Sequence, residues 1–235
     1  MNKPLKVCVV IPAYNEGTVI KNVVKDILGA LKKTDMNYEV VVVNDGSKDD
    51  TSKEAVKGGA KVIDHILNSG AGGATATGLS YANQNGYDLA VTMDADGQHL
   101  AEDVIQGLHQ AQKIKSDLLI GSRLINTEGM SRVKVLGNKG LSSITYILFG
   151  INVTDSQSGL RVYSKKALSS LRWKTSGYEF CSEMLWRANQ LNLVIDEYPI
   201  KAVYTEYSKA KGQNNWNAIN IIKSLVKRRV VEIFE

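Results

Sequence analysis

The sequence predicts an α/β fold in which a mostly parallel sheet is flanked by helices, and three observations carry this prediction. Short runs rich in β-branched residues alternate with helical patterns through the first half, as in successive strand–helix–strand units. The runs at 7–11 and 40–43 are apolar throughout, as expected of strands buried on both faces of a sheet. Polar or glycine-containing loops follow these runs, at the sheet edge where open α/β folds bind ligands.

In the first half of the chain, strand and helix patterns take turns. We expect strands at Lys6–Ile11, Glu39–Asn44, Lys61–His65, Leu89–Met93 and Asp117–Gly121. The helices expected between them are Glu16–Lys32, Lys48–Lys57, Gly72–Asn85 and Ala101–Lys113. The first helix has apolar residues at helical spacing from Val19 to Leu31. Pro12 is expected to end the first strand, because proline has no N–H to donate to the sheet.

The second half of the chain has fewer strand signals. We expect helices near Asn138–Phe149, Lys165–Leu171, Cys181–Leu191 and Trp216–Phe234, a strand at Gly159–Ser164 and an extended segment at Val194–Tyr204. The chain therefore divides into two halves, residues 1–125 and 126–235. We place the boundary near Asn126, inside one compact domain rather than at a linker.

The bulk composition is ordinary for a soluble globular protein, with 43% hydrophobic and 23% charged residues. No apolar stretch approaches the roughly 18 residues of a spanning helix, and the N-terminus leads directly into a strand pattern. We therefore expect a cytoplasmic chain without a signal peptide. Cys8 and Cys181 lie in apolar contexts and are expected to be buried thiols rather than a disulfide or a metal pair.

The positive charge is concentrated at the C-terminal end, where residues from Lys201 onward carry +4 of the net +5. Such a segment suits anionic lipid, a phosphate substrate or nucleic acid, although a solvated helix end is the simpler interpretation. Nucleic acid is the least favoured partner, because no aromatic and basic stacking platform accompanies the charge. The apolar and basic residues from Ile219 to Phe234 predict either an interfacial amphipathic helix or a core-packed terminal helix.

The most informative motif follows the apolar run at Leu89–Met93, which ends in Asp94 and Asp96. Because side chains at i and i+2 of a strand point to the same side, both carboxylates can reach one point beyond the sheet. Mg²⁺ typically takes one or two carboxylates together with the phosphates of its substrate. Asp-Ala-Asp-Gly is also an ordinary turn sequence, but its place after a buried strand favours a site for a metal-bound nucleotide diphosphate.

Two more loops follow the first two strands. Tyr14 can lie against a base or ribose, while Asn15 and Glu16 can cap the next helix. Asp45 can accept hydrogen bonds from a base or ribose, although Asp-Gly-Ser is equally an ordinary turn.

A glycine-rich loop from Asn68 to Gly78 resembles a phosphate loop but lacks the dinucleotide pattern. That pattern belongs after the first strand, and here Gly70-x-Gly72-x-x-Thr75 lacks its third glycine. NAD binding is therefore disfavoured, and the glycines are expected to let a helix approach a nucleotide closely.

Taken together, these loops resemble those of the family-2 glycosyltransferases, which have the Rossmann-like nucleotide-sugar-binding fold known as GT-A. The matching motifs are V-I-P-A-Y-N-E, V-V-N-D-G-S, the asparagine–glycine loop, M-D-A-D-G-Q-H, I-G-S-R ending at Arg123, D-S-Q-S-G-L-R ending at Arg161, and G-Y-E-F ending at Phe180. They occur in the family's order over about 200 residues. Within the family the chain is most similar to the dolichyl-phosphate and polyprenyl-phosphate sugar transferases.

The resemblance implies a nucleotide-sugar-binding half at 1–125 and a smaller acceptor-binding half at 126–235. It assigns the donor nucleotide to Pro12, Ala13, Tyr14, Glu16, Asp45, Gly70, Asp94 and Ala95. Mg²⁺ or Mn²⁺ is assigned to Asp94, Asp96 and Gln98, and the acceptor to Arg123, Arg132, Ser158 and Arg161. Catalysis is assigned to Asp94, Asp96, Arg123 and Arg161.

Arginine suits these roles because its planar fork grips phosphate through two donors. The simpler interpretations are a strand-surface charge for Arg161 and a structural salt bridge for Arg123. The family usually has a basic residue near Ala71, so here only main-chain N–H groups of that loop can serve a phosphate.

The implied activity is an inverting, metal-dependent transfer of a hexose-type sugar from a UDP- or GDP-sugar to a polyprenyl or dolichyl phosphate. A phosphate acceptor is already ionised and needs no base, whereas a hydroxyl acceptor needs a carboxylate such as Asp155, Glu179 or Glu183. A soluble acceptor, or a non-catalytic nucleotide-sugar-binding protein, remains open. Many lipid-phosphate relatives carry membrane spans, whereas this sequence shows none. We therefore expect peripheral contact with the inner face of the membrane or a separate membrane partner protein.

Overall fold

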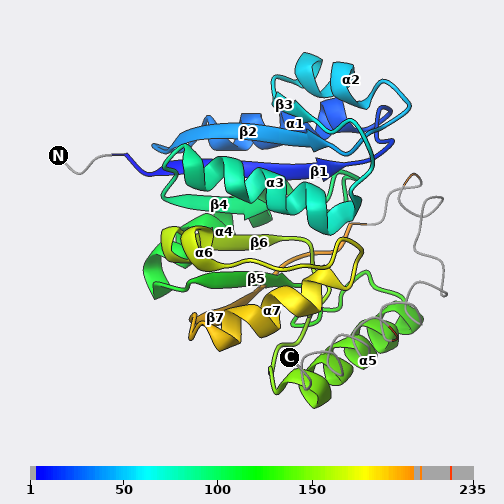
Figure 1. Ribbon diagram of the computed structural model, residues 1–235, viewed down its shortest axis with the longest axis vertical. Helices are drawn as coiled ribbons and strands as arrows, with labels where there is room; N and C mark the ends of the chain where they lie inside the picture. The colour runs from blue at the N-terminus through cyan, green and yellow to red at the C-terminus, as the bar shows by residue number, and fades with distance from the viewer. Residues whose placement is uncertain (1–3, 204–206, 208–222, 224–235) are drawn as a thin grey trace.

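The computed structural model describes residues 4–203 together with residues 207 and 223. Within this part of the chain a seven-stranded sheet has the order β3-β2-β1-β4-β6-β5-β7 (Figure 1). The strands are β1 Lys6–Ala13, β2 Asn37–Asn44, β3 Lys61–Asp64, β4 Leu89–Thr92, β5 Leu118–Ser122, β6 Arg161–Ser164 and β7 Ile195–Pro199. Of these strands only β6 is antiparallel to its neighbours, and it joins β4 to β5. Both halves of the sequence therefore contribute to one sheet.

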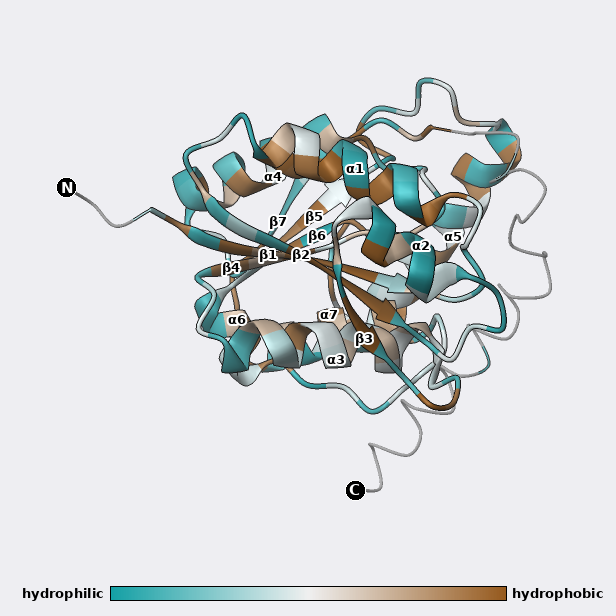
Figure 2. Ribbon diagram, turned by 90° about the horizontal axis from the view of Figure 1, so that it is seen from above, coloured by the Kyte–Doolittle hydropathy of each residue, from teal (hydrophilic) through white to brown (hydrophobic). Residues whose placement is uncertain are grey.

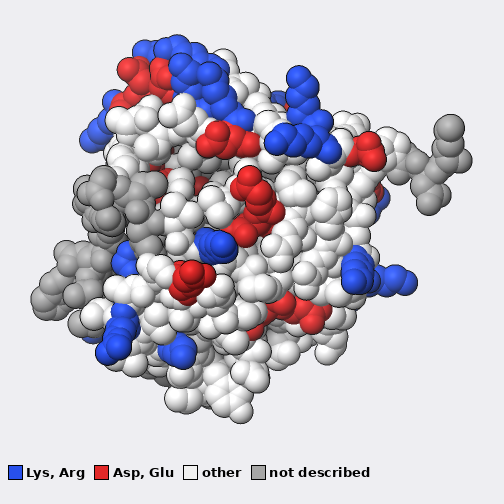
Figure 3. Space-filling view, turned by 180° about the vertical axis from the view of Figure 1, so that it is seen from behind, with Lys and Arg blue, Asp and Glu red and all other residues white. Residues whose placement is uncertain are grey.

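Helices cover both faces of this sheet, with α1 and α4 on one side and α3, α6 and α7 on the other (Figure 2). The helices are α1 Ile20–Leu31, α2 Thr51–Gly58, α3 Gly70–Gln84, α4 Ala101–Ile114, α5 Arg132–Phe149, α6 Lys165–Ser170 and α7 Phe180–Gln190. On the face seen in Figure 3, acidic and basic side chains intermingle on the described surface.

The central strand β1 explains why its sequence does not alternate between apolar and polar residues. Val7, Val9 and Ile11 pack in the cluster that contains α1 and α4. Cys8 and Val10 pack in the opposite cluster, with residues of α3 and α7. All five side chains are fully buried, as expected of a strand with a helix layer on each face.

The structure confirms the expected strands and helices in the described residues, with shifted ends. The expectation that Pro12 ends the first strand is wrong, because β1 continues to Ala13 with Pro12 paired to Val43. The Val10 carbonyl faces β4 and accepts from the Met93 main chain. Because backbone groups of a strand face alternate sides, the backbone nitrogen of Pro12 faces β4 as well, at a point beyond the last residue of β4, Thr92. The missing N–H therefore removes no bond of the β1–β4 ladder in the described strands.

Three other expectations concern the helices and the cysteines. Helix α5 begins at Arg132, six residues earlier than expected, because the Ser131 hydroxyl caps it by accepting from the Lys134 main chain at 3.4 Å. The helix expected at Trp216–Phe234 lies outside the described residues. Cys8 and Cys181 are buried free thiols, as expected. No helix in the described part of the chain combines the length and apolar content that a bilayer span requires.

The carboxyl ends of β1, β2, β4 and β5 meet at one edge of the sheet, where the functional loops lie. The loops after β1 and β2 are joined into one unit by hydrogen bonds. The Asn15 main chain donates to Ser47 Oγ, and the Lys48 main chain donates to Asn15 Oδ1, both at 2.9 Å. Gly17 N lies 2.9 Å from Asp49 Oδ2. This edge therefore presents a connected frame rather than separate loops.

Candidate active site

The acidic pair predicted after β4 lies at this edge. The Asp94 side chain is 50% exposed, and its Oδ2 lies 3.0 Å from Nε2 of His99. Asp96 is held by its own turn, since Oδ1 accepts from the Gln98 main chain at 3.0 Å. The Gln98 side-chain amide donates to the other oxygen of Asp96. The structure thus brings Asp94, Asp96 and Gln98 together, with Gln98 orienting Asp96.

The two carboxylates differ in their ease of ionisation. Burial and the negative charge of Asp94 both raise the pKa of Asp96 above its ordinary value. Burial also disfavours ionised Asp94, but the hydrogen bond and charge of His99, with the charges of Arg123 and Arg161, outweigh it and lower its pKa. Asp94 therefore ionises more readily than Asp96.

This donor set fits a hard divalent cation. Carboxylate oxygens are the ligands that Mg²⁺ and Mn²⁺ prefer. Among the described residues, no group of three His, Cys, Asp or Glu side chains is arranged to hold a metal by itself. A cation here would take its remaining ligands from substrate phosphate and water, as Mg²⁺ commonly does.

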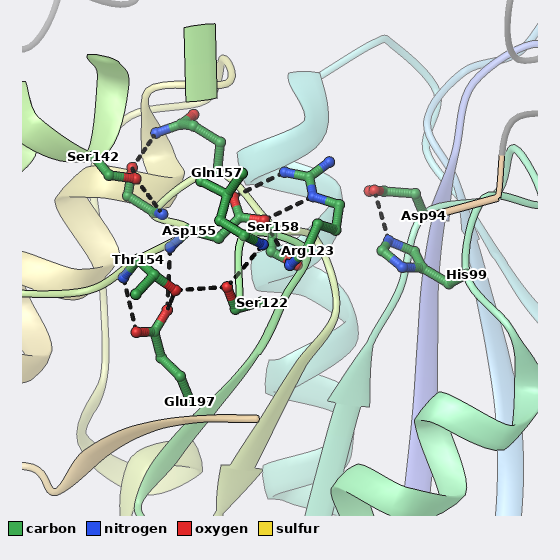
Figure 4. A network of polar contacts seen from close by, with 12 residues as sticks. Asp94, His99, Ser122, Arg123, Ser142, Thr154, Asp155, Gln157, Ser158 and Glu197 are labelled. Atoms are coloured by element: carbon green, nitrogen blue, oxygen red, sulfur yellow. Dashed lines mark hydrogen bonds and ion pairs between the residues drawn. The ribbon is translucent and has the colours of Figure 1, made fainter. Parts of the chain in front are cut away.

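Arg123, directly after β5, forms a two-point ion pair with Asp155. Its Nε lies 2.7 Å from Oδ2 and its Nη2 lies 2.9 Å from Oδ1. Asp155 is fully buried, and Glu197 accepts from its main-chain N–H at 3.1 Å. Figure 4 shows Arg123 between Asp155 and Asp94, and its positive charge helps lower the pKa of Asp94. The arginine is therefore fixed in place beside the acidic pair.

Arg161 lies inside the protein rather than on its surface. It is 1% exposed, so its interpretation as a strand-surface charge is wrong. Its guanidinium donates to the carbonyls of Ser158, Ser156 and Cys181 at 2.9, 2.7 and 3.2 Å. Met184 Sδ accepts a further contact at 3.1 Å. In this structure Arg161 organises the loop before β6 and influences Asp94 through its charge.

The other two predicted acceptor residues lie in different environments. Ser158 is fully buried near Arg123 (Figure 4), and its hydroxyl has no hydrogen-bond partner in the described structure. A buried hydroxyl without a hydrogen-bond partner is rare in a folded protein, and it is therefore a candidate contact for a polar ligand. Arg132 is exposed at the first residue of α5.

On the donor side, Asp45 is committed to the loop before α3. Its Oδ1 accepts from the Ser69 main chain, the Ser69 hydroxyl and His65 Nδ1 at 2.8, 2.7 and 2.8 Å. Its Oδ2 accepts from the Gly70 main chain at 2.8 Å. Burial opposes the ionisation of Asp45, but these hydrogen bonds outweigh it and lower the pKa. Asp45 therefore shapes the edge of the site in this structure.

The remaining predicted nucleotide residues offer few side-chain groups. Ala13 and Ala95 are buried, and Pro12 belongs to β1, so these three offer mainly backbone atoms. Tyr14 is 42% exposed at the rim. Glu16 is buried, and its carboxylate accepts from the Tyr207 hydroxyl at 2.7 Å.

The glycines in the first turn of α3 pack against another segment of the chain. A Cβ on Gly70 would lie 2.4 Å from the Ser176 carbonyl oxygen, and one on Gly72 would lie 2.6 Å from that of Thr175. Gly72 N also donates to the Ser176 carbonyl at 2.8 Å. These glycines thus let the segment before α7 approach α3 closely, and their expected contact with a nucleotide stays a prediction.

The three carboxylates considered as bases are also constrained. Asp155 is buried in its ion pair with Arg123. Glu183 is 1% exposed, and its two oxygens accept from the main chains of Lys174 and Thr175 at 3.0 and 2.8 Å. Glu179 folds back over its own loop, where its Oε2 occupies space that a Cβ on Gly177 would need.

Sequence reasoning missed several residues of this site. His99 appears in the sequence analysis only as the last residue of the M-D-A-D-G-Q-H motif, yet it contacts Asp94. Gly159 was treated as part of a motif, yet a Cβ there would lie 2.3 Å from Asp94 Oδ1. Tyr207 reaches Glu16 from a segment 191 residues away in sequence. A histidine directly after an acidic loop is a usable signal, whereas the other two contacts exist only in the folded chain.

Solved structures first show the fold. Glucosyl-3-phosphoglycerate synthase from Mycobacterium tuberculosis, in complex with Mn²⁺, UDP-glucose and phosphoglyceric acid, matches with a TM-score of 0.68 and 21% identity, covering 94% of this chain and 79% of that chain. Mannosyl-3-phosphoglycerate synthase from Rubrobacter xylanophilus matches with a TM-score of 0.70 and 18% identity, covering 97% and 74%. These likenesses confirm the GT-A fold.

Sequence comparison then gives the family. Residues 8–172 match glycosyl transferase family 2. The UDP-N-acetylglucosamine–dolichyl-phosphate N-acetylglucosaminyltransferase of Methanococcus voltae is 40% identical, over 96% of this chain and 97% of that protein. The undecaprenyl-phosphate mannosyltransferase of Micrococcus luteus is 31% identical, over 88% and 87%. The chain belongs to glycosyl transferase family 2 and is a glycosyltransferase, which confirms the predicted resemblance.

Proposed function

We propose that this glycosyltransferase moves a sugar from a nucleotide-diphosphate sugar to a polyprenyl or dolichyl phosphate, with inversion at the anomeric carbon. The observation that carries the proposal is that the three candidate base carboxylates are engaged in contacts within the protein. Asp155 and Glu183 are buried and hydrogen-bonded, and Glu179 folds over its own loop. A hydroxyl acceptor needs a base in reach, whereas a phosphate oxygen is already ionised near neutral pH. The site therefore suits a phosphate acceptor.

The names of the relatives agree with this acceptor. The Methanococcus voltae and Micrococcus luteus proteins are named for dolichyl phosphate and undecaprenyl phosphate, and they align over most of their length. The former is named for a UDP-sugar, so UDP-sugars are the first donors to test and GDP-sugars the second.

We propose that Asp94 and Asp96 hold Mg²⁺ or Mn²⁺, with Gln98 orienting Asp96 or adding a ligand. When bound, the cation would neutralise charge on the leaving nucleoside diphosphate. The protein contributes a half-exposed, ionised Asp94 and a turn that fixes Asp96. This proposal accounts for two carboxylates close enough that the charge of Asp94 raises the pKa of Asp96.

Positive charge on the acceptor side comes from the arginines. Because Asp155 holds Arg123 at two points, its guanidinium needs little reorganisation as negative charge moves from acceptor to leaving group. Arg161 would stabilise the same charge from beneath the loop, and the Ser158 hydroxyl would donate to the acceptor phosphate. Arg132 would meet the phosphate or the lipid surface at the start of α5.

On the donor side, Tyr14 supplies an exposed ring for the base or ribose. Backbone atoms of Pro12, Ala13 and Ala95 would line the nucleotide. Asp45 and Gly70 would act by holding the loop before α3, since Asp45 accepts hydrogen bonds from the main chains of both Gly70 and Ser69.

Helix α5 supports contact with a membrane at its inner, cytoplasmic face. Val133, Leu136 and Ile147 on this helix are 76%, 75% and 76% exposed. Lys134 and Lys139 on the same helix are exposed as well. Exposed apolar and basic side chains on one helix suit the boundary of an anionic bilayer. A separate membrane partner protein is the alternative.

Liposome flotation tests the membrane contact. We expect the protein to float with anionic vesicles at low salt and to lose this binding in Leu136→Asp. Val56→Asp on α2 is the control, since Val56 is 58% exposed and lies away from α5. Equal flotation of all three proteins, or none by the wild type, would contradict direct lipid contact through α5.

A transfer assay tests the function itself. The chain is incubated with Mg²⁺ or Mn²⁺, polyprenyl phosphate and each of several radiolabelled UDP- and GDP-sugars, and the label is followed into organic solvent. We expect one donor to label the lipid and Asp96→Asn to reduce labelling by about 100-fold or more. Label confined to a water-soluble product would indicate a soluble acceptor. Donor binding without any turnover would indicate a nucleotide-sugar-binding protein.

A further inference from the structure

Asp94 is held from two sides by groups that no predicted site contains. On one side lies the His99 ring, which Figure 4 shows turned toward the Asp94 carboxylate. Its side chain is 2% exposed, and Nε2 lies 3.0 Å from Asp94 Oδ2. Its other nitrogen, Nδ1, is buried and has no partner in the described residues. In the described structure the hydrogen bonding of this buried imidazole is therefore directed to Asp94 alone.

On the other side lies the Cα of Gly159. A Cβ built on Gly159 would fall 2.3 Å from Oδ1 and 2.5 Å from Oδ2 of Asp94, so the carboxylate occupies the space that any side chain at 159 would need. The backbone of Gly159 is itself fixed, because Thr92 Oγ1 donates to its carbonyl at 2.9 Å. Arg161 holds the preceding carbonyl of Ser158, also at 2.9 Å.

We propose that His99 and Gly159 are positioning residues that set the orientation of the Asp94 carboxylate for its cation. This inference rests on the proposed cation site. The Nε2–H of His99 fixes Oδ2, and the bare Cα of Gly159 sets how far the carboxylate can turn toward the acceptor-side loop. Outer groups of this kind commonly control metal affinity, since they fix the orientation and basicity of the ligand.

One consequence is that the two halves of the reaction site are coupled. Gly159 belongs to the loop that also carries Asp155 and Ser158, whereas Asp94 and His99 belong to the loop after β4. A substitution in the acceptor-side loop should therefore alter cation affinity on the donor side, although neither residue of the acidic pair is itself replaced.

Two amides at position 99 separate a specific contact from mere filling of space. Glutamine places its amide nitrogen near the position of Nε2, whereas asparagine places it near Nδ1 and falls short of Asp94. Mn²⁺ binding in the presence of UDP is measured by electron paramagnetic resonance, which needs no turnover. We expect His99→Asn to weaken Mn²⁺ binding by about 10- to 100-fold and His99→Gln to remain near the wild-type value.

Gly159→Ala is expected to weaken Mn²⁺ binding by a similar factor, because the carboxylate must move. The controls are His109→Gln, at an exposed position of α4, and Gly29→Ala, where a Cβ meets nothing within 4 Å. Both should bind Mn²⁺ as the wild type does, and circular dichroism checks that every variant is folded.

Each possible result bears on His99, on Gly159 or on the cation site itself. Equal Mn²⁺ affinity in His99→Asn and His99→Gln would overturn the role of His99, and wild-type affinity in Gly159→Ala would overturn that of Gly159. If Gly159→Ala does not fold, the asparagine and glutamine pair still decides the proposal through His99. Failure of wild-type protein to bind Mn²⁺ with UDP would overturn the cation site itself, and the positioning role with it.

Discussion

Arg123 and Asp155 meet through two parallel contacts, Nε to Oδ2 at 2.7 Å and Nη2 to Oδ1 at 2.9 Å. The Arg123 main-chain N–H donates to the same carboxylate at 3.1 Å. The pair joins the end of β5 to the loop before β6, and it lies beside Asp94. The geometry of the phosphate side of the site therefore depends on a carboxylate that never reaches solvent.

Removing Asp155 should destabilise the protein, because it leaves a partly buried arginine without its counter-charge. We expect Asp155→Ala to lower the free energy of unfolding by about 3 kcal/mol, measured by urea denaturation. Asp50→Ala breaks an exposed ion pair with Lys53 and should leave stability unchanged within error. Equal stability of both variants would show that the Arg123–Asp155 pair does not hold the loop.

Arg123→Lys retains the charge but removes the fork that Asp155 orients. We expect transfer to fall by about 100-fold with a much smaller loss of stability than in Asp155→Ala. The transfer rate and the urea midpoint, measured on the same preparation, check this. An unchanged rate would mean that Arg123 serves the fold alone.

The Asp45 carboxylate should make stability depend on pH. Its folded pKa is lowered below the unfolded value of about 3.9, so its contribution is fully present above that pH. The contribution is lost as the pH falls through the folded pKa, because protonation removes acceptors for Ser69, His65 and Gly70. The difference in unfolding free energy between wild type and Asp45→Asn should therefore be constant from about pH 6 to 5 and shrink below about pH 4. If the difference in unfolding free energy did not change with pH, the ionised Asp45 carboxylate would not be what stabilises the loop.

Two glycines should respond oppositely to the same added methyl group. A Cβ on Gly72 meets the Thr175 carbonyl at 2.6 Å, so Gly72→Ala should cost about 1–3 kcal/mol. A Cβ on Gly137 in α5 meets nothing within 4 Å, so Gly137→Ala should gain about 0.5–1 kcal/mol of helix stability. Thermal unfolding of the two variants checks the sign, and a stabilising Gly72→Ala would disprove the close packing of α3.

Asp96→Asn should separate stability from activity. The pKa of Asp96 is raised by burial and by the charge of Asp94, so its ionised form opposes folding at neutral pH. We expect the metal-free variant to be at least as stable as the wild type, and its transfer rate to fall by about 100- to 1000-fold. Calorimetry in EDTA and the transfer assay measure the two effects. A variant that loses both together would indicate a structural carboxylate.

Much of the fold could be predicted because the buried parallel strands and amphipathic helices leave local patterns in the sequence. The run at 7–11 is apolar for the reason the structure gives, a helix layer on each face. The prediction for Pro12 was wrong because the loss of its N–H matters only where the neighbouring strand offers an acceptor. That depends on where β4 ends, which the sequence around Pro12 does not show.

The acidic pair was visible because its spacing and its place after a strand are local. The burial of Arg161 could not be predicted in this way, because it depends on the carbonyls of Ser156, Ser158 and Cys181, which surround the guanidinium only in the folded chain. The packing role of Gly70 and Gly72 could not be predicted either, because the segment that packs on them lies about 100 residues later. Local motifs thus indicated the chemistry, and tertiary contacts decided which group performs it.

The most direct test of the account is the anomalous scattering of manganese in crystals grown with UDP and Mn²⁺. We expect a manganese peak bonded to a carboxylate oxygen of Asp94 or Asp96 and to the diphosphate of UDP. A diphosphate bound at this edge with manganese absent from both carboxylates, or UDP bound at another part of the molecule, would contradict it.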